Sequence, residues 1–350
     1  MNKQLLLCGT RKGTPIKVLE NGDHNKPKKV TNLRNTGINQ YTKPGSVTLN
    51  ASMDHLSVHN QELLGSYLAD LVEADGCIIC PKTFSKQAHI DICFCIADKP
   101  FAEFLQTLLG GNIVIGASKN FVKLKINQQH KLLRLCQLMN DFFRTPKIDV
   151  LHNLIKYFNE KYNANLMMKG LNTSPLCSNA WLAGFSDGDA NFLLEISKPR
   201  SGRVYVRIQY RLRLAQIYAK CKSLQLECNS MYGICFAIAI LFDCNLYSYT
   251  HQRALGHNKS LLKAYHSYSV VTTNIKSDHL VCSYFDNYPL FSSKRLNYLD
   301  WRCVYELRNF KQHYTPQGVA KISEIKARFN TNRTVFTWDH LSTFYAKTRE

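Results

Sequence analysis

The chain has 350 residues, of which 45% are hydrophobic, enough for one large core or two ordinary domains. Its 45 Lys and Arg outnumber 25 Asp and Glu, and the net charge of +20 favours a nucleic-acid partner, although ribosomal and membrane-surface proteins are also basic. The most apolar stretch, Tyr232–Phe242, is too short to span a bilayer and predicts a buried helix, so we expect no membrane partner.

Residues 1–57 are rich in Lys, Asn, Thr and Gly and show little apolar periodicity. This composition predicts a basic N-terminal arm without regular structure rather than a packed domain. Its cluster of Lys26, Lys28 and Lys29 could contact phosphate or form a solvated tail. The LLLC run near the N-terminus is too short for a secretion signal, and the sequence leaves targeting undetermined.

Two helical segments further along the chain resemble each other. The first, ELLGSYLADLVEADG, ends at Gly76, and the second, SNAWLAGFSDGDA, ends at Ala190. Aligning Asp75 with Asp189 gives a spacing of 189 − 75 = 114 residues. A repeat of this length is the size of a domain, so the chain is expected to contain two copies of one fold.

Each copy continues with alternating, strand-like segments and further helices. The later segments are helices at 100–110 and 217–243, strands at 121–126 and 268–272, and closing helices at 129–162 and 288–307. Each half is therefore predicted as α-β-β-α-β-β-α with an antiparallel sheet, an α+β fold. We place the first domain at 58–165, a linker rich in turn residues at 166–179 and the second domain at 180–350, as a monomer with an internal pseudo-dimer.

The 13 Cys residues show neither the regular spacing of a secreted disulfide framework nor paired zinc motifs. Cys77 and Cys80 form one CxxC without a second half, which favours buried or incidental thiols. Reduced thiols fit an intracellular compartment.

The segments Leu68–Gly76 (LADLVEADG) and Leu182–Ala190 (LAGFSDGDA), each preceded by an aromatic residue, resemble the signature of LAGLIDADG homing endonucleases. The segments FRTPKI at 143–148 and YPLFSSKRLNYLDW at 288–301 are also similar to fungal organellar intron-encoded members. The resemblance covers roughly residues 60–345. It implies the single-chain, double-motif type: two pseudo-symmetric domains, packed through their motif helices, whose sheets form a DNA-binding saddle. It also implies a mitochondrial location.

The motif residues support this interpretation on physical grounds. Small side chains would let the two motif helices approach at backbone distance: Ala69, Ala74, Ala183, Gly184 and Gly188. Asp75 and Asp189 would then meet at the helix ends, where each helix dipole adds negative charge. Two such carboxylates repel each other unless cations lie between them.

We therefore expect Mg²⁺ at Asp75 and Asp189, with the adjacent Gly76 and Ala190 as further metal-contacting positions. Mn²⁺ could substitute, whereas Ca²⁺ is expected to bind without supporting cleavage. Bound ions would activate a water molecule and stabilise the departing 3′ oxygen at each scissile phosphate. The expected product is a double-strand break in a long, asymmetric DNA target, with short 3′ overhangs.

By resemblance, three further residues are assigned to the catalytic pocket. Lys125 in FVKLK would be a cation near the scissile phosphate, and Gln216 and Asp98 would organise water. A surface Lys or a Gln at a strand end is the alternative interpretation. Glu73 and Asp187 hold positions that are mainly structural in the family and are not assigned to catalysis.

Two positions depart from the signature: Asp70 and Ala190 each replace Gly. A carboxylate between two closely packed helices is costly unless it faces solvent or accepts a hydrogen bond. These departures keep two alternatives open. One is a maturase-type RNA-binding cofactor for group I intron splicing, with intron RNA as partner, and the other is a relative that binds DNA without cutting it.

The segment 203–214 alternates between apolar and polar residues and predicts a half-buried strand. Its outer face carries Arg203, Tyr205, Arg207, Gln209, Arg211 and Arg213, preceded by Lys198 and Arg200. Such a strand suits the major groove of double-stranded DNA, and a solvated edge is the alternative. The first half offers a less cationic face, with His89, Asp91, Cys93 and Cys95 and the candidate DNA contacts Lys82 and Lys123. Unequal halves predict an asymmetric target.

Overall fold

The structure is a computed structural model that describes residues 19–20, 57–83, 85–197, 204–219, 229–255 and 258–345. Most of the predicted N-terminal arm lies outside these residues, as do Lys198, Arg200 and Arg203. Side chains are described for the same ranges except 19–20 and 253–262.

The first half begins with α1 (Val58–Asp75), which leads directly into β2 (Gly76–Ile79). The elements that follow are β3 (His89–Cys95), α2 (Lys99–Leu109), β4 (Asn112–Ile115), β5 (Phe121–Ile126), α3 (Gln129–Met139) and α4 (Ile148–Tyr162). The four strands form an antiparallel sheet in the order β2-β3-β5-β4. The closing helix predicted at 129–162 is two helices, because the chain turns between Asn140 and Lys147, where Pro146 cannot continue a helical hydrogen-bond pattern.

The second half repeats this order from α5 (Trp181–Asp189), which leads directly into β6 (Ala190–Ser197). The later elements are β7 (Tyr205–Ala215), α6 (Tyr232–Leu241), β8 (Asn245–Leu255), β9 (Asn258–Val271), α7 (Ile275–Asn287), α8 (Lys294–Asn309) and α9 (Pro316–Ala327). Its antiparallel strands follow the order β8-β9-β7-β6, and the short β1 (Leu19–Glu20) pairs with β8 in parallel.

Three predicted boundaries in this half are wrong. The helix expected at 217–243 is only α6, because Ile217 forms a β-bridge with Ser230 instead of entering a helix. The strand expected at 268–272 is the end of the much longer β9. The closing helix expected at 288–307 begins only at Lys294, and α7 before it is a separate helix capped by the side chain of Asn274.

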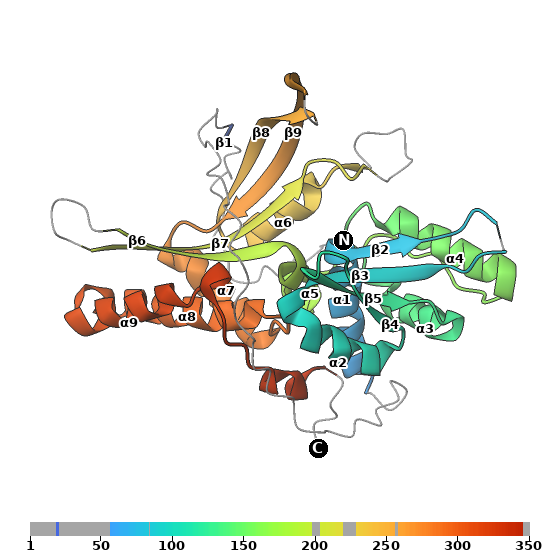
Figure 1. Cartoon of the computed structure of the whole chain (residues 1–350), viewed down its shortest axis with the longest axis horizontal. Helices are drawn as coiled ribbons and strands as arrows, with labels where there is room; N and C mark the ends of the chain where they lie inside the picture. Colours follow the sequence, from blue (N-terminus) through green and yellow to red (C-terminus); the bar gives the residue numbers. More distant parts are fainter. Residues whose placement is uncertain are drawn as a thin grey trace, which may run out of the picture.

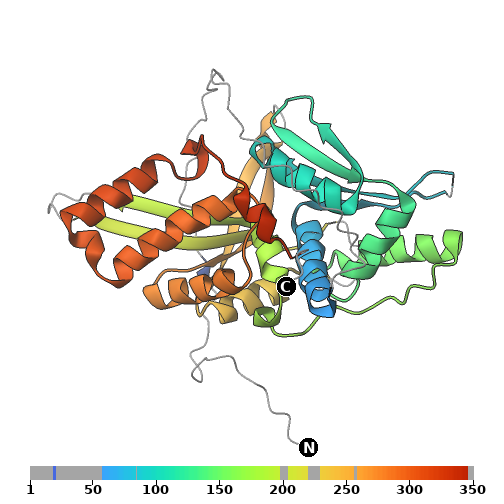
Figure 2. The same cartoon turned by 90° about the horizontal axis from the view of Figure 1, so that it is seen from below.

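The two halves lie side by side along the long axis of the molecule, with α1 and α5 at their junction (Figure 1). Helices of the second half cover one face of its sheet, as the perpendicular view shows (Figure 2). The alternation of β7 explains this layering, because its even-numbered side chains from Val206 to Leu214 are buried under the helices. The predicted α+β fold with two pseudo-symmetric domains is confirmed.

Helix α6 is buried on one side, at Ile234, Cys235, Ile238 and Ala239, while Ile240 is 44% exposed. No helix in the described residues has the length and apolar character needed to cross a membrane. No disulfide links the cysteines of the described ranges.

Helices α1 and α5 pack at backbone distance. A Cβ atom on Gly184 would lie 2.3 Å from the carbonyl oxygen of Tyr67, and one on Gly188 would lie 2.4 Å from the Cβ atom of Ala74. Residues 64–73 of α1 are buried, so this helix lies inside the protein. The small residues of the motif are therefore what allow the two halves to meet.

We predict that Gly184→Ala destabilises the protein by about 1–3 kcal/mol, because the added methyl group would force the backbone of α1 away. Chemical denaturation of both proteins measures this difference. Gly170→Ala is the matched control, since a Cβ atom there meets nothing within 4 Å. Equal stability of the two variants would contradict a tight α1–α5 contact.

Candidate active site

Asp75 and Asp189 are the last residues of α1 and α5. The chain enters a strand immediately after each of them, so both carboxylates are held at a helix-to-strand junction. The two junctions adjoin, because a Cβ atom on Gly188 would lie only 3.2 Å from Oδ2 of Asp75. The helix pair thus brings the two predicted acids to one place.

The electrostatics of this place are those of two carboxylates held close together in a partly buried site. Burial and the charge of Asp189 raise the pKa of Asp75 to about 6, against the opposing charges of Lys294 and Lys147. Burial also raises the pKa of Asp189, and the same two lysines oppose the shift. Within the described part of the chain, neither carboxylate accepts a hydrogen bond or forms an ion pair within 4.0 Å.

Two lysines that sequence reasoning did not assign cap the ends of the motif helices. Lys147 Nζ donates to the carbonyl oxygens of Val72 at 3.0 Å, Glu73 at 2.6 Å and Gly76 at 3.0 Å. Its counterpart Lys294 Nζ donates to the carbonyl oxygens of Ser186, at 3.2 Å, and Gly188. Each ammonium group therefore lies at the negative end of a helix dipole, beside the acids.

The two lysines stand in segments singled out in the sequence, FRTPKI and YPLFSSK. Burial lowers the pKa of Lys294, while the charges of Asp187, Asp75 and Asp189 raise it. No side-chain pattern marks such lysines, because their hydrogen-bond partners are backbone carbonyls. The signal that could have found them is the Lys that follows a similar loop in both halves.

Glu73 of α1 is buried and binds the loop that carries Lys147. Its carboxylate accepts hydrogen bonds from the backbone N–H of Thr145 at 2.6 Å and of Arg144 at 3.0 Å, and from the Thr145 hydroxyl at 2.6 Å. A fourth bond comes from the other half, from Nε1 of Trp181 at 2.8 Å.

Asp187 of α5 is buried and binds the loop that precedes Lys294 in the second half. It accepts from the backbone N–H of Phe291 at 2.8 Å, from the backbone and hydroxyl of Ser292, and from the hydroxyl of Tyr67 at 2.6 Å. The aromatic residue before each motif thus donates to the acid of the other motif. These reciprocal bonds fix the helices relative to each other and orient both lysine loops.

Asp70, which departs from the signature, is fully buried in the α1–α5 interface. It accepts a hydrogen bond from the backbone N–H of Phe185, which lowers the cost of burying its carboxyl group. Burial raises the pKa of Asp70 well above its usual range. Its other carboxyl oxygen, Oδ1, is buried without a hydrogen-bond partner among the described residues, so the cost of the departure is only partly offset.

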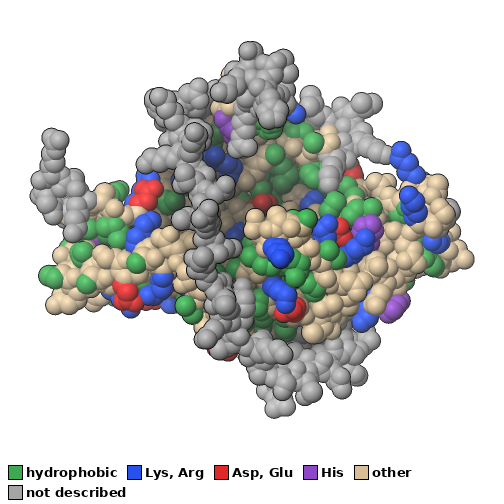
Figure 3. Space-filling view, viewed as in Figure 1, with side chains coloured by type: hydrophobic (Ala, Val, Ile, Leu, Met, Phe, Trp, Pro, Cys, Tyr) green, Lys and Arg blue, Asp and Glu red, His purple; other side chains and the backbone are tan. Residues whose placement is uncertain are grey.

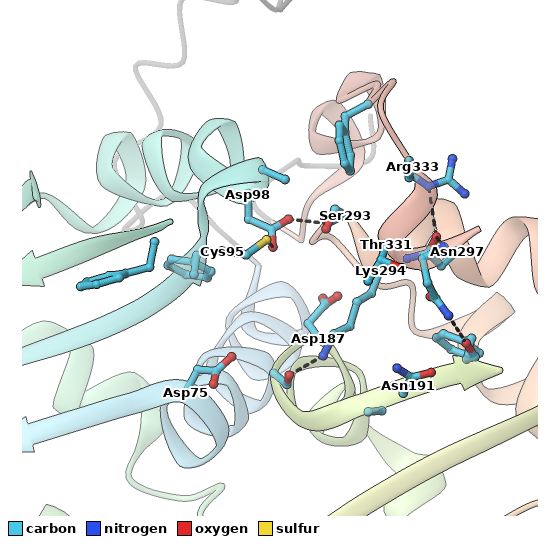
Figure 4. A pocket seen from close by; sticks show the side chains of 18 of the residues that line it. Asp75, Cys95, Asp98, Asp187, Asn191, Ser293, Lys294, Asn297, Thr331 and Arg333 are labelled. Carbon is cyan, nitrogen blue, oxygen red and sulfur yellow. Dashed lines mark hydrogen bonds between the residues drawn. The ribbon is translucent and has the colours of Figure 1, made fainter. Parts of the chain in front are cut away.

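A cavity of about 730 Å³ opens beside Asp75. Asp98, Asp187 and Lys294 surround it with Asp75, as the close view shows (Figure 4). Asp98 accepts a hydrogen bond from the backbone N–H of Ser293 at 2.6 Å, next to Lys294. Gly188 and Ala190, on either side of Asp189, also line the cavity.

The other two assigned residues lie away from this cavity. Lys125 is on β5 with Asp91 and Asn112 as its strand partners, and Gln216 Nε2 donates to the hydroxyl of Ser248 at 2.7 Å. Neither residue is part of the cavity lining. Of the three residues assigned by resemblance, Asp98 is the one that lines the same cavity as Asp75.

The predicted outer face of β7 is cationic. Arg207 and Arg213 are exposed, Arg211 is half-buried and Tyr205 is 60% exposed. Gln209 differs from the expectation, because it is 6% exposed and accepts a hydrogen bond from Arg211 Nη2 at 3.2 Å. The amide oxygen of Gln209 is therefore already used by the guanidinium of Arg211.

In the first half, Lys82 is exposed and Lys123 forms an ion pair with Asp91 at 3.1 Å. Arg207 of β7 is also paired, with Glu195, but β7 carries Arg211 and Arg213 in addition, so the first-half face is less cationic than that of β7. Lys and Arg side chains are spread over both halves around a central hollow (Figure 3).

Comparison with known proteins gives consistent matches. Residues 182–305 match the family model described as LAGLIDADG endonuclease. The chain is 30% identical over 311 residues to the intron-encoded DNA endonuclease aI3 of Saccharomyces cerevisiae, covering 83% of this chain and 75% of the relative. It is 28% identical over 299 residues to an uncharacterized cox1 intron-2 protein of Schizosaccharomyces pombe, covering 84% of this chain and 82% of the relative.

Two solved structures share the fold. The I-LtrWI LAGLIDADG homing endonuclease bound to target DNA matches with a TM-score of 0.52 and 19% identity over 78% of this chain and 99% of its own. The LAGLIDADG meganuclease I-AabMI bound to uncleaved DNA matches with a TM-score of 0.54 and 18% identity over 76% of this chain and 99% of its own.

We predict that Asp75→Asn stabilises the metal-free protein at pH 8 by on the order of 1–3 kcal/mol and has little effect near pH 4. The pKa of Asp75 in the folded state, about 6, lies above its unfolded value, so its ionisation costs stability as pH rises from about 4 to about 6. Denaturation in the presence of EDTA at both pH values measures the effect. The control is Asp141→Asn, at an exposed position. A gain in the unfolding free energy of Asp75→Asn that is the same at both pH values would contradict the burial argument.

Proposed function

The chain belongs to the LAGLIDADG endonuclease family, and from that premise we propose that it is a site-specific homing endonuclease that makes a metal-dependent double-strand break in DNA. The observation that carries the proposal is the meeting of Asp75 and Asp189 at one partly buried place without hydrogen-bond partners among the described residues. A carboxylate pair of this kind is electrostatically unfavourable until a cation binds.

The residues present fit a hard divalent cation, with Asp75 and Asp189 as its protein ligands. No group of three or more His, Cys, Asp or Glu in the described ranges is arranged to hold a metal. We propose that water, substrate phosphate and the backbone at Gly76 and Ala190 complete the coordination. This is the pattern expected for Mg²⁺. We propose Mn²⁺ as a substitute and Ca²⁺ as an ion that binds without supporting cleavage.

A divalent cation bound there supplies charge stabilisation at the scissile phosphate and a more acidic water. The backbone carbonyl of Gly76 already accepts a hydrogen bond from Lys147, whereas Ala190 borders the cavity. Both remain proposed metal-contacting positions through their backbone.

The lysines have two roles in this proposal. Lys147 and Lys294 hold the C-terminal ends of α1 and α5, which positions Asp75 and Asp189. Their ammonium charges also offset part of the negative charge that the acids and a bound phosphate would bring together. Asp98 supports this arrangement from the first half by holding the backbone of Ser293 beside Lys294.

The duplex would lie against the sheet face that carries Arg207, Arg211 and Arg213. The DNA-bound relatives I-LtrWI and I-AabMI support a DNA target. We propose a long asymmetric site, because β7 is more cationic than β3, and cleavage of both strands from one centre with short 3′ overhangs. The protein acts as a monomer, since one chain holds both motifs.

The intron-encoded relatives support organellar encoding, and we propose a mitochondrial location. A maturase role with intron RNA is the second candidate, and the hydrogen bond from the backbone N–H of Phe185 to Asp70 offsets part of the cost of the departure that favoured it.

We predict that Asp75→Asn and Asp189→Asn each reduce cleavage by at least about 100-fold, because one carboxylate alone holds the cation poorly. The assay mixes full-length protein with duplexes spanning candidate intron-insertion sites, with Mg²⁺ or with EDTA. Asp141→Asn, at an exposed position in the loop that follows α3, should cut like the wild type. DNA binding should persist in both site variants, since phosphate contacts come from Lys and Arg.

Cutting that survives in either site variant would overturn the proposal. A wild-type protein that never cuts these duplexes but accelerates splicing of a group I intron would establish the maturase function instead.

A further inference from the structure

The chain returns from the second half to the junction of the halves after α9. We call residues 330–345 the return segment, which contains the short helices η6 (Asn330–Asn332) and η7 (Asp339–Thr343). Both cartoon views show it leaving the helices of the second half and ending beside α1 and α2 (Figures 1 and 2). Its start is bound to the second half, because Arg333 forms an ion pair with Asp300 of α8 at 2.6 Å.

The end of the return segment packs against the first half. Phe344 is 2% exposed, and its ring centroid lies 5.1 Å from that of Phe104 and 6.4 Å from that of Phe101, both on α2. The same ring lies 5.5 Å from that of Tyr67 on α1 and 4.6 Å from that of Phe291, which precedes α8. The return segment therefore joins the two halves through one aromatic cluster.

This aromatic cluster encloses Tyr67, which is fully buried. The rings of Phe344 and Phe291 meet the Tyr67 ring edge to face, at 89° and 88°, and the ring of Tyr345 lies 5.7 Å away. Aromatic pairs favour an edge-to-face geometry, because the positive edge of one ring faces the negative face of the other. Three rings thus determine where the Tyr67 hydroxyl points, and two of them belong to the return segment.

The Tyr67 hydroxyl connects the aromatic cluster to the candidate active site. It donates to Asp187 at 2.6 Å, and the same carboxylate accepts hydrogen bonds from the backbone of the loop that carries Lys294. Lys294 Nζ in turn donates to the carbonyl oxygen of Gly188, the residue before Asp189. The rings of the return segment are therefore linked to Asp189 by a continuous series of contacts.

The return segment also contacts the same loop and the cavity directly. His340 Nε2 donates to the carbonyl oxygen of Phe291 at 3.0 Å. Earlier in the segment, Thr331 and Arg333 line the cavity beside Asp75 (Figure 4). The return segment thus borders the cavity and supports the loop that forms part of it.

In the first motif the corresponding support comes from nearby residues. Glu73, the counterpart of Asp187, accepts its bond from Trp181, whose ring stacks on that of Phe185 at 4.9 Å. The guanidinium of Arg144, in the loop that carries Lys147, lies 5.7 Å from the centroid of the Trp181 ring. These residues belong to a motif helix and its lysine loop, whereas the second motif depends on a separate segment of the chain.

We propose that Phe344 and Tyr345 are positioning residues for DNA cleavage. By fixing Tyr67, they keep Asp187 and the Lys294 loop in the arrangement that the reaction needs. This inference rests on the proposed function for the identity of the reaction. Both side chains are buried, so neither presents a surface to DNA. Loss of the rings should therefore slow the cutting of bound DNA without weakening its binding.

The test compares Phe344→Ala with Phe158→Ala, at a position on α4 that is 1% exposed and lies outside the aromatic cluster. Both changes remove a buried ring, so both should lower stability. Full-length protein is assayed for duplex affinity in EDTA and, at saturating protein with Mg²⁺, for the rate of a single round of cleavage. Phe344→Ala should slow cleavage by at least about 10-fold with duplex affinity within about 2-fold, since small misplacements at a reacting centre are costly. Phe158→Ala should leave both quantities within about 2-fold, because it is not connected to the motif acids.

Three further variants separate positioning from a loss of packing. Phe344→Leu keeps most of the buried volume and should recover most of the rate. Tyr345→Ala removes the less buried ring, is the milder change, and should slow cleavage several-fold. Tyr67→Phe removes only the hydroxyl that binds Asp187, and combining it with Phe344→Ala should cost little more than the more severe single change. Equal slowing by Phe344→Ala and Phe158→Ala, an unchanged rate in Tyr345→Ala, or additive losses in the double variant would overturn the inference.

A measurement without cleavage separates failure of this inference from failure of the proposed function. Hydrogen exchange in EDTA reports on the backbone N–H groups of Phe291 and Ser292, which donate to Asp187. Relative to the amides of β7 in the same protein, their exchange should be at least about 10-fold faster in Phe344→Ala and unchanged in Phe158→Ala. Faster exchange in a chain that never cuts DNA would support the link from Phe344 to Asp187 while overturning the proposed activity. Unchanged exchange in Phe344→Ala would overturn the link itself.

Discussion

Helices α1 and α5 approach so closely that Gly184 has no room for a side chain beside the carbonyl oxygen of Tyr67, 2.3 Å from where its Cβ would be. This contact determines where both helix ends lie, because each helix passes directly into a strand of its own sheet. Two bonds secure it across the halves, from Trp181 to Glu73 and from Tyr67 to Asp187. The positions of the sheets and of the acids follow from one helix–helix contact.

The same contact brings negative charges together, and two lysines at the helix ends offset part of them. Two helix C-termini and two carboxylates at one partly buried place concentrate negative charge. Lys147 and Lys294 offset some of it by binding the helix-end carbonyls, yet the pKa of Asp75 is still raised to about 6. The remaining excess is what a divalent cation would neutralise. Glu73 and Asp187, two residues before these acids, hold the lysine loops, so motif and loop form one unit in each half.

Sequence reasoning predicted what depends on periodicity and repetition: the two motif helices, the α+β order and the alternation of β7. It failed where apolar composition was taken for helix, at 217–243, because Ile217 pairs with Ser230. Lys125, assigned by resemblance, stays a prediction. Lys147 and Lys294, which reach the helix ends, were missed because contacts with backbone carbonyls leave no side-chain pattern. The length of the β8–β9 ribbon was also missed, since its outer residues have no alternating apolar face.

The central claim is that Asp75 and Asp189 share a bound cation, and Mn²⁺ affinity measured by electron paramagnetic resonance on the complex with duplex DNA tests it most directly. If the ion is shared, Asp75→Asn, Asp189→Asn and the double variant should lose similar Mn²⁺ affinity. The first change already removes most of the binding, so the second has little left to remove. Independent, additive losses, or affinity equal to that of the wild type in any of the three, would contradict it.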